Sequence, residues 1–152
     1  MTPTNIREEL EPLCHKVKIC GSYRRGKPDF NDLDIVCIPK NPMAISQWVS
    51  SRASEITKAG GTWKQFFIGD QKVDLILTDH YGWAGSVLQW TGPGKFNIVC
   101  RRKAKDKGWK LNNRGLWDNK TGRCVAYKSE LEILALIGMA HHLKPSSRRK
   151  YE

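Results

Sequence analysis

Gly21-Ser22-Tyr23-Arg24-Arg25-Gly26 precedes Asp32-Leu33-Asp34-Ile35-Val36 in this chain of 152 residues. The first stretch predicts a glycine-bounded turn that carries arginines, and the second predicts a strand. A turn that leads into a helix can hold phosphate oxygens through its backbone N–H groups and the helix dipole. Side chains alternate along a strand, so Asp32 and Asp34 should share one face. Together the two stretches indicate a site for a metal-bound nucleoside triphosphate.

A third carboxylate, Asp74, lies in the strand-like run 72–77. Gly69-Asp70 fits a two-residue hairpin turn between 62–68 and 71–78, so Asp74 is expected on a hairpin strand. Nucleotidyl transfer uses two divalent ions about 3.5–4 Å apart, and Mg²⁺ prefers oxygen ligands. We therefore predict that three carboxylates are the catalytic groups and hold Mg²⁺ or Mn²⁺: Asp32, Asp34 and Asp74. In this scheme Ser22 and Arg25 hold the outgoing phosphates.

The charge of the chain indicates a polyanionic partner. The sequence has 26 Lys and Arg against 15 Asp and Glu, a net charge of +11. Because each neutralised phosphate releases counterions, binding to nucleic acid should weaken steeply with salt. The alternative that charge alone leaves open is a basic protein with no nucleic-acid partner.

The cysteines and the apolar runs concern compartment and membrane. The five cysteines are irregularly spaced, which favours neither a zinc site nor a disulfide framework. Reduced thiols are typical of a cytoplasmic, nuclear or viral-replication compartment. The first ten residues lack the apolar core of a signal peptide, so we expect no secretion. No apolar run approaches the roughly 20 residues that span a bilayer, so no membrane partner is expected.

The local patterns predict an α+β protein, with a small mixed α/β sheet lobe at 1–79 and a smaller α+β lobe at 80–152. In the first lobe we expect helices at 5–15 and 41–59 and strands at 16–20, 33–38, 62–68 and 71–78. In the second we expect helices at 81–90, 95–107 and 129–138, a hairpin within 111–127, and a loose basic tail at 144–152. Asn41-Pro42 and Ser129 with Glu132 are the clearest helix starts.

Over residues 15–138 these motifs resemble those of the family X DNA polymerases, the polymerase β superfamily. Gly21–Gly26 is similar to the family's G-S-[FY]-R-R-G, and Asp32–Asp34 is similar to its D-x-D strand. Val73-Asp74-Leu75 resembles the strand with the third carboxylate. Trp90-Thr91-Gly92, followed by Asn97 and Arg101, resembles the aromatic-Thr-Gly turn and the next helix. The last of these motifs is the most specific to the family.

The resemblance implies a minimal palm-plus-thumb polymerase, similar to viral members, in which a nucleotidyltransferase-type palm precedes a lobe that closes on the nucleotide. It implies dNTP contacts from Gly21, Ser22, Arg25, Trp90, Gly92 and Asn97. It also implies DNA contacts from Arg101, which matches a template-strand residue. The neighbouring basic residues should contact DNA phosphates: Arg102, Lys103 and Lys105. We expect primer-template or gapped DNA as the partner of a monomeric enzyme.

Three departures and one absence qualify this resemblance. Gln89 replaces a tyrosine of polymerase β-like members, which puts discrimination against ribonucleotides in doubt; Ile76 replaces an arginine, and Asn113-Arg114 replaces an acidic-aromatic pair. Only about 20 residues precede Gly21, so we expect no lyase activity, and distributive synthesis over short gaps. Two alternatives stay open: a nucleotidyltransferase with a non-DNA or template-independent substrate, and an inactive nucleic-acid-binding module.

Overall fold

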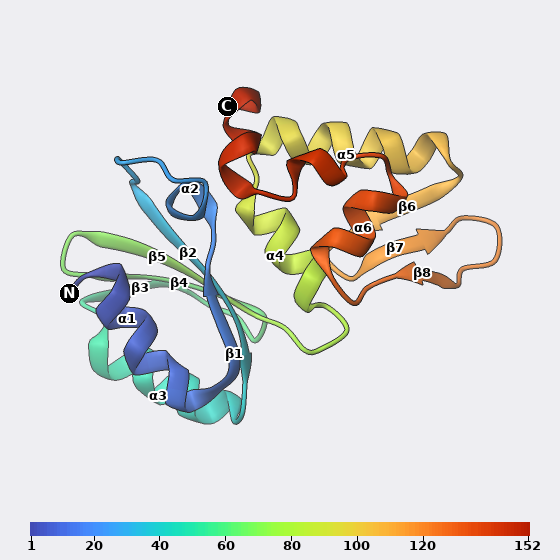
Figure 1. The fold of residues 1–152 in the computed structure, drawn as a ribbon. Helices are drawn as coiled ribbons and strands as arrows, with labels where there is room; N and C mark the ends of the chain where they lie inside the picture. Colours follow the sequence, from blue (N-terminus) through green and yellow to red (C-terminus); the bar gives the residue numbers. More distant parts are fainter.

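The computed structural model describes residues 1–152, and its first lobe is built on a five-stranded sheet (Figure 1). The strands are β1 (Cys14–Ile19), β2 (Asp32–Pro39), β3 (Glu55–Ala59), β4 (Trp63–Ile68) and β5 (Gln71–Leu77), in the order β1-β2-β5-β4-β3. The central strands β2 and β5 are parallel, and the other pairs are antiparallel. The predicted hairpin turn at Gly69-Asp70 is confirmed, because Ile68 pairs with Gln71.

One face of this sheet packs on two helices, α1 (Pro3–Leu10) and α3 (Pro42–Arg52). Alternation places Leu33 and Ile35 of β2 on this face, where they are fully buried with Ile6 and Ile45 from the helices. Burial of each such side chain stabilises the fold by about 1.5–3 kcal/mol. The carboxylates at the alternate positions of the same strands therefore face the other side of the sheet.

The second lobe has its own core and its own sheet. Its elements are α4 (Trp83–Thr91), α5 (Gly94–Asp106), β6 (Trp109–Asn112), β7 (Gly115–Asp118), β8 (Cys124–Ala126), α6 (Glu130–Leu136) and the 3-10 helices η2 (Ala140–His142) and η3 (Pro145–Tyr151). Phe96, Leu116, Ile133 and Leu134 are fully buried at its centre. No helix is both long and apolar enough to cross a membrane.

A small apolar cluster joins the two lobes. Val36 of β2 and Ile76 of β5 pack with Val87 of α4 and with Cys20. Helix α4 therefore lies against the carboxylate face of the sheet (Figure 1). This contact brings the end of α4 close to the short helix α2 (Gly21–Arg24). The mixed α+β fold class predicted from the sequence is confirmed, whereas the domain boundary at residues 79 and 80 stays a prediction.

Two predicted helices of the first lobe are wrong in extent. The helix that begins after Asn41 ends at Arg52, and residues 55–59 form the exposed edge strand β3. The apolar spacing at Ile56 suggested a helix, but that side chain is 45% exposed and its strand pairs with β4. The first helix is capped by Thr2, not Asn5, and ends at Leu10; η1 (Glu11–Leu13) and β1 follow it.

Two expectations for the second lobe are also corrected. The predicted hairpin within 111–127 is a three-stranded sheet that already begins at Trp109. The tail at 144–152 is not loose: residues 145–151 form η3, and Arg148 is fully buried. The Arg148 Nε atom donates to the carbonyl of His142 at 2.8 Å. Because this arginine has buried partners, it is not free to contact DNA as part of a mobile basic tail.

Candidate active site

The three predicted catalytic carboxylates lie on neighbouring strands. Asp34 of β2 and Asp74 of β5 are register partners across the parallel pair. Asp32 lies two residues before Asp34 on the same face, because side chains alternate along a strand. On the other side of β5, Gln65 of β4 is the register partner of Asp74. The sheet therefore places Gln65, Asp74 and Asp34 in one row, with Asp32 beside its end.

Asp34 shows the electrostatic effect of this arrangement. Burial, followed by the neighbouring charges of Asp74 and Asp32, raises the pKa of its carboxyl to about 7, against the opposite effect of Arg25 and Lys72. The Lys72 Nζ atom lies 3.8 Å from Asp32 Oδ2, which offsets part of the negative charge. A bound divalent cation would favour the ionised form of Asp34, because an opposite charge nearby lowers a carboxyl pKa.

The donor set fits a hard divalent ion in its chemistry, since all three side chains offer carboxylate oxygens. As the side chains stand, no three acidic, cysteine or histidine residues converge closely enough to enclose a metal. Asp74 is the residue set apart: it is 5% exposed, and its Oδ1 atom accepts two hydrogen bonds from β4. No hydrogen bond in the structure involves its Oδ2 atom. This is the oxygen that would bind a metal ion together with Asp32 and Asp34.

The glycine-bounded motif places backbone directly beside Asp34. Gly21 has φ +60°, and a Cβ atom at this position would lie 2.1 Å from Asp34 Oδ2. Only glycine combines this left-handed conformation with so close an approach. The motif folds as the short helix α2, and Cys20 donates its backbone N–H to the Asp34 carbonyl at 2.7 Å. The phosphate-binding turn predicted from the sequence thus lies against the predicted metal ligands.

A cleft of about 480 Å³ lies between the two lobes beside this turn. It gathers every predicted nucleotide-binding residue and the two carboxylates of β2, whereas Asp74 does not line it. Its walls are Gly21, Ser22, Arg25, Lys27, Asp29, Phe30, Asn31, Asp32 and Asp34 from the first lobe, and Gln89, Trp90, Gly92, Pro93, Gly94 and Asn97 from the second. The fold therefore brings together motifs that are separated by more than fifty residues in the sequence.

Arg25, the predicted phosphate ligand, has two partners in this structure. Its Nη1 atom donates to the carbonyl of Thr91 at 2.5 Å, and its Nη2 atom contacts Glu152 Oε2 at 3.3 Å. Lys27 Nζ lies 3.4 Å from the same glutamate oxygen. The Glu152 carboxylate thus pairs with Arg25, where a nucleotide phosphate was expected, and with the neighbouring Lys27.

Arg24 has a role that the sequence did not reveal. It forms two hydrogen bonds with the Glu130 carboxylate, at 3.0 and 2.6 Å, and donates to Thr91 Oγ1 at 2.8 Å. The buried Arg148 binds the same glutamate at 3.2 Å. Burial alone would raise the pKa of Glu130, but the hydrogen bonds and charges of the two arginines hold it below its usual value. This network fixes α2 against α4 and α6.

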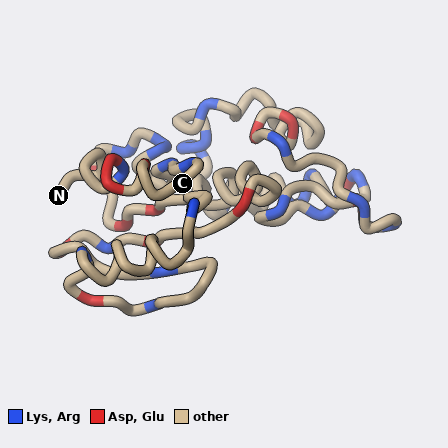
Figure 2. The backbone as a smooth tube through the Cα atoms, turned by 90° about the horizontal axis from the view of Figure 1, so that it is seen from below, with Lys and Arg blue, Asp and Glu red and all other residues tan.

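The four predicted DNA-binding residues lie on α5. Arg101, Arg102, Lys103 and Lys105 are all exposed, and none has an ion-pair partner. Figure 2 shows that Lys and Arg occur along the backbone of both lobes. Free cations on an exposed helix are available for phosphate contacts, which is the role expected for them.

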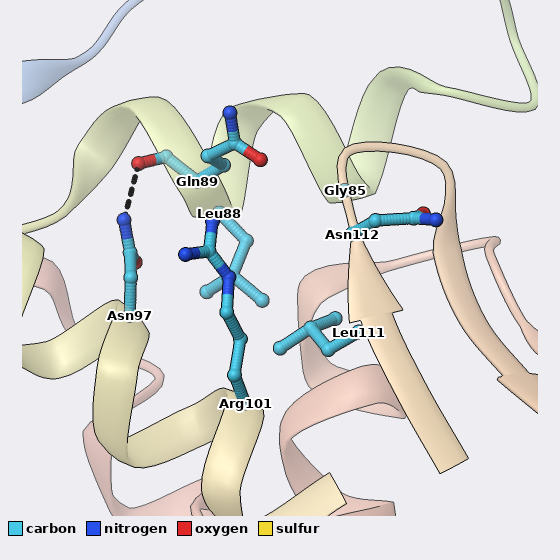
Figure 3. A pocket seen from close by; sticks show the side chains of 7 residues that line it. All are labelled: Gly85, Leu88, Gln89, Asn97, Arg101, Leu111 and Asn112. Carbon is cyan, nitrogen blue, oxygen red and sulfur yellow. Dashed lines mark hydrogen bonds between the residues drawn. The ribbon is translucent and has the colours of Figure 1, made fainter. Parts of the chain in front are cut away.

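Asn97 and Arg101 extend from α5 toward Leu88 and Gln89 of α4, and these four side chains line a small pocket (Figure 3). The Asn97 side-chain amide donates to the backbone carbonyl of Gln89 at 2.8 Å. Gln89, one of the three departures from the family pattern, therefore forms part of the cleft wall. Of the other two, Ile76 is buried under α4, and Arg114 pairs with Asp79 at 3.0 Å where the lobes join.

Trp63 and Gln65 are two further site residues that the sequence reading missed. Both donate to Asp74 Oδ1, at 2.8 and 2.9 Å. A signal for Gln65 was present, because counting back from the two-residue turn at Gly69-Asp70 places it opposite Asp74. No comparable pattern pointed to Trp63, whose contact is diagonal across the strands.

The comparisons with known proteins agree with this geometry. Residues 86–149 match the family model described as DNA polymerase beta thumb. The chain is 34% identical to the DNA nucleotidylexotransferase of Eulemur macaco, with 97% of this chain and 31% of that relative covered. It is 24% identical to the Repair DNA polymerase X of African swine fever virus, with 88% of this chain and 82% of the viral protein covered.

A solved structure of polymerase beta from Leishmania infantum, described as a ternary P/T complex, has the same fold. Its TM-score is 0.77 at 20% identity, and 96% of this chain and 73% of that chain are covered. This chain spans about a third of the length of the lemur relative. In its thumb match, its sequence relatives and its fold, the chain is similar to the family X DNA polymerases.

Proposed function

We propose that this chain is a DNA polymerase of the family X type, which transfers a nucleotide from a dNTP to a primer 3′-hydroxyl. One observation carries the proposal: a single cleft joins Asp32 and Asp34 of the sheet to Trp90 and Asn97 of the second lobe. Carboxylates beside a phosphate-binding turn suit many nucleotidyl transfers. The second lobe, which matches a polymerase thumb, supports a polymerase nucleotide as the substrate.

Asp32, Asp34 and Asp74 would hold Mg²⁺ or Mn²⁺ at the edge of the cleft. Bound there, the metal would activate the primer hydroxyl and offset charge on the leaving phosphates. The raised pKa of Asp34, caused by burial and by the neighbouring charges of Asp74 and Asp32, supports this role, because a bound cation would offset both effects. The protein's own contribution is to place these oxygens on neighbouring strands of a rigid sheet.

The cleft residues would bind and orient the nucleotide. Ser22 and Arg25 would hold its phosphates once Glu152 releases the Arg25 guanidinium. Trp90 would pack beside the sugar, and Gly92, with φ +62°, allows the backbone to approach it closely. Asn97 would contact the base after its amide exchanges the Gln89 carbonyl for that partner.

The exposed basic side chains of α5 would hold the DNA. Arg101, Arg102, Lys103 and Lys105 have no acidic partner to displace, so phosphate contacts are available without an internal cost. With so few contacts we propose that a monomer fills short gaps distributively. A steep fall in DNA affinity with salt is expected, and a flat response would contradict this part of the proposal.

Primer extension on a one-nucleotide gap, with metal and four separate dNTPs, tests the function. We expect templated addition by the wild type. Asp34→Asn and Asp74→Asn should abolish incorporation while DNA binding, measured by fluorescence anisotropy, survives. Full activity in either variant would refute the assignment of these carboxylates. DNA binding without extension by the wild type would support the inactive module instead.

A second candidate is template-independent addition to a primer end. The 34% identity to a protein named DNA nucleotidylexotransferase favours it. The same assay separates the two, because a template-independent enzyme extends a single-stranded primer with non-complementary nucleotides. Extension restricted to the templated nucleotide would exclude this candidate. A nucleotidyltransferase with a non-DNA acceptor would transfer nucleotide in the absence of any primer.

A further inference from the structure

Asp74 is the most enclosed of the three carboxylates, and two side chains of β4 hold it. The Trp63 indole N–H donates to its Oδ1 atom at 2.8 Å, and the Gln65 amide donates to the same oxygen at 2.9 Å. Gln65 lies directly across the antiparallel pair, and Trp63 lies one diagonal step away on the same face. One oxygen of Asp74 is therefore fixed twice, while the other has no protein partner.

The donors themselves are held in place. The Thr57 hydroxyl donates to Gln65 Oε1 at 3.0 Å, which turns the amide nitrogen toward Asp74. The Trp63 ring meets the Trp90 ring edge to face, with centroids 5.5 Å apart. Lys58 Nζ lies 3.6 Å from the centroid of the Trp63 ring. Each donor thus has a second contact that restricts its rotation.

We propose that Trp63 and Gln65 are positioning residues that fix the carboxylate of Asp74, so that its Oδ2 atom is presented for metal binding. This inference rests on the proposed function, because it concerns the metal ligand assigned there. Trp63 also connects this carboxylate to Trp90, which lines the nucleotide cleft on the other lobe. The orientation of the third carboxylate is in this way coupled to the wall of the nucleotide site.

The physical reason is that two hydrogen bonds to one oxygen restrict the rotation of a buried carboxylate. A buried acceptor that loses its hydrogen-bond donors must rotate or find other partners. Without Trp63 and Gln65, Asp74 would turn in its site and would present Oδ2 for only part of the time. Loss of partners that orient a metal ligand typically costs about 10–100-fold in metal affinity or activity.

Two variants remove one donor each while they keep the shape of the side chain. Trp63→Phe keeps an aromatic ring against Trp90 but has no N–H, and Gln65→Met keeps the length of the side chain but has no amide. The matched controls are a glutamine of β5, in the same sheet, and a tryptophan of α4, which packs on that sheet. Gln71→Met changes an amide that bonds only to the carbonyls of Asn31 and Lys72. Trp83→Phe changes an indole that has no hydrogen-bond partner and whose ring lies beneath Lys16 Nζ.

The first measurement needs no catalysis. In ¹H–¹⁵N spectra of the full chain, the Trp63 indole N–H is assigned by its loss in Trp63→Phe. We expect Asp74→Asn to shift this resonance and to leave that of Trp83 in place. An unmoved Trp63 resonance would overturn the proposal, because the hydrogen bond on which it stands would be absent.

The second measurement is Mn²⁺ binding in the presence of dATP, followed by electron paramagnetic resonance. We expect Trp63→Phe and Gln65→Met each to weaken Mn²⁺ binding about 10–100-fold, and both controls to bind like the wild type. In primer extension the Mg²⁺ concentration for half-maximal rate should rise, and excess Mg²⁺ should restore much of the rate. Wild-type Mn²⁺ affinity in both donor variants would overturn the proposal.

These readouts separate the proposal from the function on which it rests. If the wild type binds Mn²⁺ but extends no primer, the polymerase assignment fails, whereas the binding series still decides the role of Trp63 and Gln65. If Trp63→Phe does not fold, judged by circular dichroism, Gln65→Met alone decides the outcome.

Discussion

Arg24 and Glu130 form a two-pronged ion pair, with contacts of 2.6 and 3.0 Å between residues 106 positions apart in the chain. The pair links the glycine-arginine motif of the first lobe to the N-terminal turn of α6 in the second. Glu130 also neutralises Arg148, which has no exposed surface. One carboxylate therefore compensates two arginines at the place where the lobes meet.

Glu130→Gln should destabilise the protein strongly, because it leaves two largely buried arginines without a negative partner. Breaking a buried pair in this way typically costs about 3–5 kcal/mol. Urea unfolding followed by circular dichroism measures the change. Glu11→Gln is the matched control, since it breaks the exposed Arg7–Glu11 pair at 2.7 Å and should cost less than about 1 kcal/mol. Equal effects of the two variants would show that the network does not stabilise the fold.

Asp34→Asn should make the metal-free protein more stable at alkaline pH. The pKa of Asp34 is about 7 in the folded chain, above its ordinary value of 3.8. Ionisation of this group therefore destabilises the folded state, and the loss begins near pH 4 and is complete above pH 7. We expect the Tm of the variant in EDTA to exceed that of the wild type by about 2–6 °C at pH 8.

The same comparison at pH 4 is its control. At pH 4 the folded wild type is protonated at Asp34 and the unfolded chain is about half protonated, so only a small part of the difference in Tm seen at pH 8 should remain. A difference that is independent of pH would mean that ionisation of Asp34 is not its cause. Adding Mg²⁺ at pH 8 should raise the Tm of the wild type more than that of Asp34→Asn.

Glu152→Gln should strengthen nucleotide binding. The variant removes the carboxylate that contacts Arg25 and Lys27, so phosphates no longer compete with it. Partly exposed ion pairs contribute about 0.2–1 kcal/mol, so we expect the dissociation constant of a dNTP to fall about two- to fivefold. Calorimetric titration with Mg²⁺ present measures it. Glu8→Gln makes the same charge change at an exposed, unpaired position; equal dissociation constants in the two variants would contradict the competition.

Gly21→Ala should damage both stability and activity. The added Cβ would meet Asp34 Oδ2 at 2.1 Å and would require a left-handed backbone with φ +60°. We expect a loss of about 1–3 kcal/mol in the free energy of unfolding, together with loss of primer extension. Gly61→Ala is the control, because its Cβ would meet nothing within 4 Å. Wild-type extension by Gly21→Ala would show that the close approach is not needed.

Local patterns were sufficient for much of this site. The alternation around Asp32 and Asp34, and the turn at Gly69-Asp70, predicted β2, β4 and β5, the three strands that carry the carboxylates and Gln65. These features depend on residues close in sequence, where backbone geometry leaves few choices. Patterns were less informative where strand pairing overrides a helical spacing of apolar residues. Residues 55–59 have helical apolar spacing, yet pairing with β4 makes them a strand.

The sequence by itself determined the carboxylate strands, the glycine turn and the basic helix, because short-range spacing controls which faces side chains occupy. Only the tertiary structure decided that Asp34 and Asp74 are register partners, since β2 and β5 are separated by a helix and two other strands. It also decided that Arg24, Glu130 and Arg148 share one buried network. Such long-range contacts depend on how the lobes pack, and no local pattern encodes that packing.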